Sequence, residues 1–186
     1  MKDKLGIGII LIVVLFFVVL TIILFITHQQ PNCELEQVLI QEKQLPQNWR
    51  KVLIVSPLAF PKEGAEDGTE IMFEYNNEYV KHTVYEYKNK PLAFLFFFLN
   101  QAVFFPSNSR SWYEYDQYNT WKLKGNQIKI QCSDTNDEFF KPKCAAVIQN
   151  GQYISDFSAP IGNEFMDFDT FKKLIIEIDF QMSVCK

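Results

Sequence analysis

The feature that most constrains this chain is an uncharged apolar run near its N-terminus, residues 6–26 (GIGIILIVVLFFVVLTIILFI), in which the only polar side chain is Thr21. A helix of this length spans about 30 Å at ~1.5 Å per residue, which matches the hydrocarbon core of a bilayer. Inside lipid, every backbone N–H and C=O must be bonded within the segment, so we expect a helix. The run therefore predicts one transmembrane anchor, with the lipid bilayer as its partner.

A cleaved signal peptide and a lipoprotein signal are the alternatives to an anchor. Signal peptides have an apolar core of about 7–15 residues followed by small residues at the cleavage site. This run is longer, and Thr27 and His28 follow it without an A-x-A pattern. Lipid attachment at Cys33 requires small and aliphatic residues before the cysteine, but residues 30–32 are Gln-Pro-Asn. The uncleaved anchor fits the sequence best.

Basic side chains set the expected orientation of the anchor. Lys2 and Lys4 precede the apolar run, and the first basic side chain after it is Lys43. An excess of positive charge marks the cytoplasmic side. We therefore predict a single-pass cell-membrane protein with a cytoplasmic N-terminus (1–5), an anchor (6–26), a stem (27–32) and an extracytoplasmic domain (33–186).

The charge of the outer part excludes some partners. Without Lys2, Asp3 and Lys4 it keeps 16 of the 18 basic and 21 of the 22 acidic residues, a formal net charge of −5. Nucleic-acid binding needs basic patches that contact phosphates, so no nucleic acid is expected as a partner. The same negative charge gives no general attraction to anionic lipid headgroups.

All four cysteines lie outside the predicted anchor, and an even number in an exported domain indicates disulfides. Of the three pairings, we predict Cys132–Cys144 and Cys33–Cys185, with the crossed pairings as alternatives. The first pair bounds a short polar loop between two predicted strands. The second would join the first and last helices. No C-x-x-C motif is present, which argues against a zinc site or a redox-active dithiol.

Hydrophobic periodicity divides the outer part into helices and hairpin-connected strands. We predict a type I′ turn at Asn150-Gly151 and a helix N-cap at Asp167. The predicted elements are a helix within 33–44, strands at 52–55, 71–75 and 79–88, a helix at 92–105, strands at 112–115, 128–132, 144–149 and 152–157 with a further one open at 121–124, and a helix at 168–182. This order indicates an α+β fold: an antiparallel sheet of about six strands with packed helices, preceded by the transmembrane helix.

Several turn and strand positions resemble small exported α+β domains of the PsbP-like kind, together with the helix after the first hairpin and the closing amphipathic helix. These positions are Leu45, Pro46, Trp49, Cys144, Val147, Tyr153 and Ile154. The resemblance covers most of residues 33–186. It implies an α+β, membrane-tethered domain, and many such bacterial proteins have no known activity. It implies no functional residue.

Motifs for catalysis or cofactor binding are missing from the sequence. There is no G-x-S-x-G, Walker or G-x-G-x-x-G sequence. His82 is the one histidine of the outer domain, and its polar neighbours in a predicted strand indicate a sheet-surface residue rather than a catalytic base. We therefore predict no catalytic residue, no cofactor and no metal site.

A calcium-loop spacing starts at Asp134 but is incomplete. Asn136 and Glu138 fall at its third and fifth positions, yet Phe139 stands where the turn needs glycine and Ala145 where the loop needs glutamate. A solvated acidic turn is the simpler interpretation.

Aromatic residues form 16% of the chain, including 18 Phe, and residues 92–99 (LAFLFFFL) are all apolar. Core packing and cross-strand pairs account for most of this content. However, successive side chains of a helix point about 100° apart, so eight apolar residues cannot all face one sheet. The uncovered side is the expected surface for a protein partner. The candidate interface residues are Phe94, Phe97, Phe98, Tyr113 and Tyr115.

These observations favour a non-enzymatic anchored domain that binds a protein or ligand at the cell envelope. The alternatives are an accessory or sensory subunit of a membrane complex and an enzyme of unrecognised type. A deep pocket with converging polar groups would indicate an enzyme. A flat exposed aromatic patch of several hundred Å² would indicate binding, and a smooth polar surface would support neither.

Overall fold

The computed structural model describes residues 33–59, 64–99, 104–105, 112–125, 127–133 and 141–185. The predicted anchor and stem lie outside the described residues. The chain divides into two units between Gln30 and Pro31, within the predicted stem. Of the helices that the structure describes, none has the length and apolar character needed to cross a membrane.

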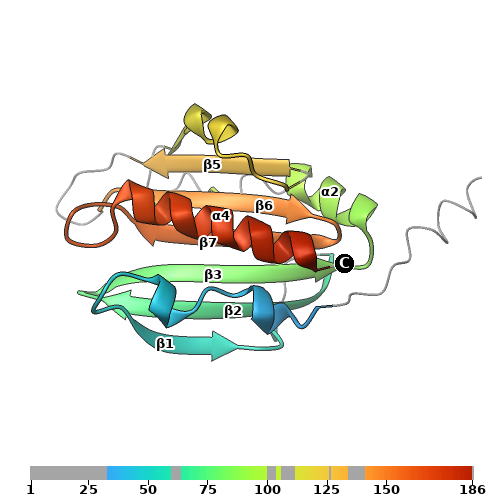
Figure 1. The fold of residues 1–186 in the computed structure, drawn as a ribbon. Helices are drawn as coiled ribbons and strands as arrows, with labels where there is room; N and C mark the ends of the chain where they lie inside the picture. The colour runs from blue at the N-terminus through green and yellow to red at the C-terminus, as the bar shows by residue number, and fades with distance from the viewer. Residues whose placement is uncertain are drawn as a thin grey trace, which may run out of the picture. The chain divides into compact units, whose positions relative to one another are not determined.

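One antiparallel sheet of seven strands forms the centre of the described domain (Figure 1). Its fold class is α+β, as predicted, and its seven strands correspond to the seven strand segments predicted for a sheet of about six. Every neighbouring pair of strands is antiparallel. Across the sheet the strands are β1 (Arg50–Val55), β2 (Ala65–Tyr75), β3 (Glu78–Tyr87), β7 (Tyr153–Pro160), β6 (Lys143–Asn150), β5 (Gln127–Ser133) and β4 (Trp112–Glu114).

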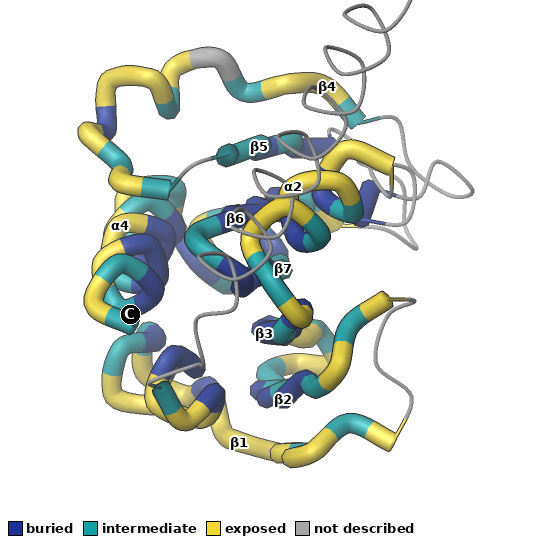
Figure 2. Tube along the Cα trace, turned by 90° about the vertical axis from the view of Figure 1, so that its right-hand side faces the viewer, coloured by how far each residue is buried: buried dark blue, intermediate teal, exposed yellow. Residues whose placement is uncertain are grey.

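Helices pack on both faces of this sheet (Figure 2). The long helix α4 (Phe168–Val184) covers one face together with two short 3-10 helices, η1 (Leu35–Val38) and η2 (Glu42–Gln44), and α2 (Lys90–Leu99) covers part of the other. A third 3-10 helix, η3 (Asp116–Thr120), connects β4 to β5. Alternate residues of the central strands face the two sides: Ala146 and Ile148 join the α4 cluster, and Ala145 and Val147 join the α2 cluster.

The predicted helix within 33–44 is replaced by η1 and η2, with extended backbone at Leu39 and Gln41 between them. Val38, Leu39 and Ile40 are consecutive and all buried. One face of an α-helix cannot bury three consecutive side chains, because each points about 100° from the last. The break also frees the Ile40 N–H, which donates to His82 Nδ1 at 3.1 Å.

The β6–β7 hairpin turn differs from the predicted type I′ turn at Asn150-Gly151. Asn150 pairs with Tyr153, so the β6–β7 turn is centred on Gly151 and Gln152, and of these two only Gly151 has a positive φ. Glycine at the first central position is typical of a type II′ turn. The type I′ pattern, with positive φ at both positions, occurs instead at residues 76 and 77, with φ of 50° and 61°.

Residues 121–124 do not form the strand that the sequence left open. Lys122 has a φ of 56°, outside the extended region. The backbone N–H groups of Lys124 and Gly125 donate to Asp179 of α4 at 2.6 and 2.7 Å rather than to a neighbouring strand. At the other end of α4, Asp167 accepts a bond from Thr170 N at 2.6 Å, which confirms the predicted N-cap.

Both predicted disulfides are present. Cys132 and Cys144 lie directly opposite each other on β5 and β6. Cys33–Cys185 joins the first described residue to the end of α4, across 152 positions of the sequence. Two disulfides indicate an oxidising extracellular environment.

Candidate binding surface

Helix α2 begins where two features of the sequence favour a helix start. Asn89 Oδ1 accepts a hydrogen bond from Leu92 N at 3.0 Å, which satisfies a backbone donor of the first turn. Pro91 lies in that turn, where its missing N–H costs nothing. The sequence therefore fixes both the start and the helical state of this segment.

The inner side of α2 is held tightly by the sheet. Ala93 and Phe97 are buried. The Phe96 ring stacks on Tyr87 with centroids 5.2 Å apart, and it lies so close to Gly64 that no Cβ would fit there. Burial raises the pKa of the Tyr87 hydroxyl to about 12. The helix is thus fixed in its rotation about its own axis.

The outer side of α2 exposes four large apolar side chains, which we call the α2 ridge. Their exposed fractions are 42% for Phe94, 49% for Leu95, 54% for Phe98 and 68% for Leu99. The Phe94 and Phe98 rings contact each other at 5.0 Å between centroids. At helical spacing, the four residues form one continuous strip on the molecular surface.

The five candidate interface residues do not form a single surface. Phe94 and Phe98 belong to the α2 ridge, but Phe97 faces the sheet with 4% exposure. Tyr113 is 45% exposed on β4, opposite Cys132, whose side chain joins the α4 cluster. Tyr115 packs on Phe168 of α4 with centroids 4.5 Å apart.

The correction has a simple cause. Ala93 and Phe97 are four residues apart, so they lie on the same side of α2, and this side packs on the sheet. In β4, successive side chains point to opposite faces of the sheet. Sequence reasoning missed Leu95 and Leu99, which complete the ridge. Residues 92–99 are all apolar, so the sequence held no contrast that would have separated Leu95 and Leu99 from the residues that pack on the sheet.

His82 is fully buried, which corrects the prediction of a sheet-surface residue. It lies on β3 between Val80 and Val84, which face the α4 cluster. Its Nδ1 accepts from Ile40 N, so the proton is on Nε2, which donates to Ser155 Oγ at 2.9 Å. Desolvation lowers the pKa of His82 to about 3.

This His82–Ser155 pair is arranged against nucleophilic catalysis. A catalytic serine donates its proton to an unprotonated histidine nitrogen, but here that nitrogen already carries the proton. The other ring nitrogen meets a backbone N–H instead of a carboxylate. Ser155 is also fully buried. The pair therefore holds the segment between η1 and η2 on the sheet.

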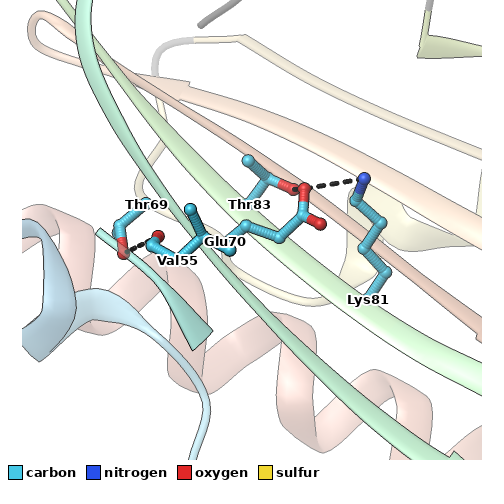
Figure 3. A network of polar contacts seen from close by, with 5 residues as sticks. All are labelled: Val55, Thr69, Glu70, Lys81 and Thr83. Atoms are coloured by element: carbon cyan, nitrogen blue, oxygen red, sulfur yellow. Dashed lines mark hydrogen bonds and ion pairs between the residues drawn. The ribbon is translucent and has the colours of Figure 1, made fainter. Parts of the chain in front are cut away.

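A polar network crosses β2 and β3 near β1 (Figure 3). Lys81 Nζ lies 2.7 Å from Glu70 Oε2, to which Thr83 Oγ1 donates at 3.1 Å. Thr69 Oγ1 donates to Val55 O at 3.1 Å. The Lys81 side chain is 43% exposed, whereas that of Glu70 is 13% exposed. Because each polar group of the network has a partner within the sheet, we read it as structural.

Two recesses of the described domain are small. One of about 200 Å³ lies between η1, η2 and the β1–β2 pair, and one of about 280 Å³ lies beside η3. Pockets for drug-sized ligands measure about 300–1,000 Å³. Over the same described ranges, no group of three or more His, Cys, Asp or Glu side chains could hold a metal ion. Residues 134–139, the incomplete calcium loop, lie outside the described residues.

No family model, curated protein or solved structure matches this chain. The similarity to PsbP-like domains therefore stays a prediction. Any function must be argued from the chain's own residues. Among the described residues, large apolar side chains are exposed on α2, on β1 and on the outer side of α4, and those of α2 include two exposed aromatic rings that contact each other, Phe94 and Phe98.

Proposed function

We propose that this chain is a membrane-tethered, extracytoplasmic domain that binds a partner without catalysis, through the α2 ridge. The exposure of four large apolar side chains on one face of one helix carries the proposal. Isolated apolar residues are common on protein surfaces, whereas four large apolar side chains that adjoin on one helix face favour a small contact with a partner. The anchor at 6–26 keeps this surface at the cell envelope.

The two disulfides support the extracytoplasmic side. Disulfides persist in oxidising compartments outside the cytoplasm. The charge distribution around residues 6–26 predicts the same side of the membrane for this domain. A domain that must persist outside the cell gains from such cross-links. In this proposal the anchor holds the domain at the membrane, and the α2 ridge makes the contact with the partner.

An enzyme is the less supported alternative. His82, the one histidine of the domain, is buried in a hydrogen-bonded pair with the wrong proton arrangement for a base. The recesses beside η1 and η3 are smaller than usual substrate pockets. Neither observation offers a place where a substrate would meet a catalytic group.

An accessory subunit of a membrane complex is a second candidate, and edge strand β1 favours it. Val52, Leu53 and Ile54 are 41–47% exposed, and an edge strand can accept a strand from a partner. However, β1 has a register irregularity between Lys51 and Leu53 and is followed by Pro57. Such features block edge pairing, so the α2 ridge remains the better-supported surface.

Cysteine accessibility in native membranes tests the proposal. Phe98→Cys places a thiol on the ridge, and Tyr79→Cys places one at an exposed position near the β2–β3 turn. A membrane-impermeant maleimide is added to intact cells, after peptide mapping shows that the native disulfides are retained. We expect rapid labelling at position 79, which reports an outside location, and slow labelling at position 98, which reports a covered ridge.

Two results would count against the proposal. Equal labelling rates at both positions would mean that nothing covers the ridge at the envelope. Labelling of position 79 only after cell lysis would place the domain on the inside and remove the envelope function altogether.

A further inference from the structure

We propose that the partner of the α2 ridge is the bilayer itself, so that the domain lies against the outer leaflet through a second, non-spanning contact. The inference rests on the proposed function and names the occupant of its binding surface. Three observations carry it: where the described chain begins, how short the stem is, and how small the ridge is.

The ridge lies at the end of the domain from which the tether leaves. Figure 1 places α2 and the C-terminal end of α4 at the same end of the sheet, and Figure 2 shows them on opposite faces of it. Cys33 is bonded to Cys185 at that end of α4. The chain toward the anchor therefore departs from the end of the domain that carries α2, on the opposite face of the sheet.

The predicted stem is too short to lift this end far from the membrane. Residues 27–32 separate the apolar run from Cys33. Fully extended, six residues reach at most about 20 Å. The end of the domain that carries Cys33 thus stays close to the lipid headgroups, within reach of the ridge.

The size of the ridge favours lipid over a second protein. A helix of ten residues is about 15 Å long, and one face about 10 Å wide gives a footprint on the order of 150 Å². A stable protein interface buries about 800 Å² on each partner. A bilayer needs no complementary shape, and amphipathic helices bury their apolar face about 5–10 Å deep in its interface. The tether supplies the high effective concentration that a small contact needs.

The apolar side chains, rather than charge, provide this contact. Lys88 and Lys90 are exposed near the start of α2, but the outer part has a net charge of −5. Anionic lipid therefore adds little on balance. The contact should form on neutral lipid, and this separates it from electrostatic adsorption.

The test uses the full chain in phosphatidylcholine vesicles, at less than one chain per vesicle. An environment-sensitive dye is attached at Phe98→Cys or, as a second ridge position, Leu99→Cys. Tyr79→Cys is the matched control, because it is exposed and lies at the far end of β3. We expect lipid-borne nitroxide to quench the ridge dyes, with iodide quenching reduced about five-fold relative to position 79 for an interfacial helix.

The outcomes separate this inference from the proposed function. Ridge dyes that iodide reaches as well as position 79 would overturn the bilayer contact. If the same positions are nevertheless protected in native envelopes, the proposed function stands with a protein partner. Protection that appears only at high chain density, with energy transfer between copies, would assign the ridge to self-association and likewise overturn the bilayer contact.

Discussion

The two faces of the sheet are covered in different ways. Helix α4 has 17 residues and contributes Phe171, Leu174, Ile175, Ile178 and Met182 to one core, whereas α2 has ten residues and buries only Ala93 and Phe97. Asp179 of α4 is buried as well. Helix α4 also exposes Ile176, Phe180 and Val184, which are spaced four residues apart, and Lys124 Nζ lies 4.9 Å from the centroid of the Phe180 ring.

The comparison separates the apolar residues that the fold requires from those that it does not bury. In α4 folding accounts for the apolar residues at 171, 174, 175, 178 and 182, which the sheet covers, while Ile176, Phe180 and Val184 stay exposed on its outer side. In α2 the apolar residues continue around the helix past the face that packs, so the excess has no folding role. Predictions that separate the two faces therefore separate stability from function.

The largest expected effect concerns the disulfide at the end of α4. Replacing Cys33 and Cys185 by serine should lower the free energy of unfolding by about 5 kcal/mol, because the loop that this bond closes spans 152 positions. Replacing Cys132 and Cys144, which are 12 positions apart, should cost about 3 kcal/mol. Denaturant unfolding of the detergent-solubilised chain measures both. A smaller loss for the long loop would contradict this ranking.

The next effect compares neighbours on α2. Phe97→Ala should destabilise the domain by about 3–5 kcal/mol, because it leaves a cavity under the helix. Phe98 lies in the same turn and is 54% exposed, so Phe98→Ala should change the free energy of unfolding by less than about 0.5 kcal/mol. Thermal or denaturant unfolding of the two variants decides it. Equal losses would mean that the ridge belongs to the core.

Much of this arrangement is readable from sequence, but only where a pattern repeats. The spacing of Phe171, Leu174, Ile175 and Ile178 predicts α4 and its inner face, because it extends over several turns. The cysteine pairs follow from strand order and chain ends. On α2 the apolar residues are continuous, so the sequence contains no contrast that tells Phe97 from Phe98, and only the packed structure fixes the rotation.

His82 shows a signal that was present but misread. Its immediate neighbours Lys81 and Thr83 suggest a polar surface, but in a strand the residues two positions away share its face. Those residues are Val80 and Val84, and both are buried. The break between η1 and η2, by contrast, depends on the long-range bond from Ile40 to His82, which no local pattern encodes.

The pH dependence of the free energy of unfolding tests the burial of His82 on the face of the sheet that α4 covers. The folded-state pKa of His82 is about 3, below the ordinary 6.5, so between these values the unfolded chain binds the proton and the folded chain does not. The stabilisation that comes from burying neutral His82 is fully present above about pH 6.5 and is lost as the pH falls toward 3. At pH 4 the loss should be about 3 kcal/mol. His82→Gln, whose amide offers one acceptor and one donor and does not titrate, is the control; a wild-type slope no steeper than that of the variant would contradict the assignment.

The smallest expected effect is the one that bears most directly on function. Leu95→Gln with Leu99→Gln removes half of the α2 ridge, yet unfolding free energy should change by no more than about 0.5 kcal/mol, because both side chains are about half exposed or more. Ile176→Gln on the outer side of α4, at 38% exposure, is the matched control and should be equally mild. The two variants should differ in the vesicle experiment, where only the α2 variant loses lipid protection at position 98. If the α2 variant instead loses more than 1 kcal/mol, its leucines serve the fold, and the ridge loses its claim to be a binding surface.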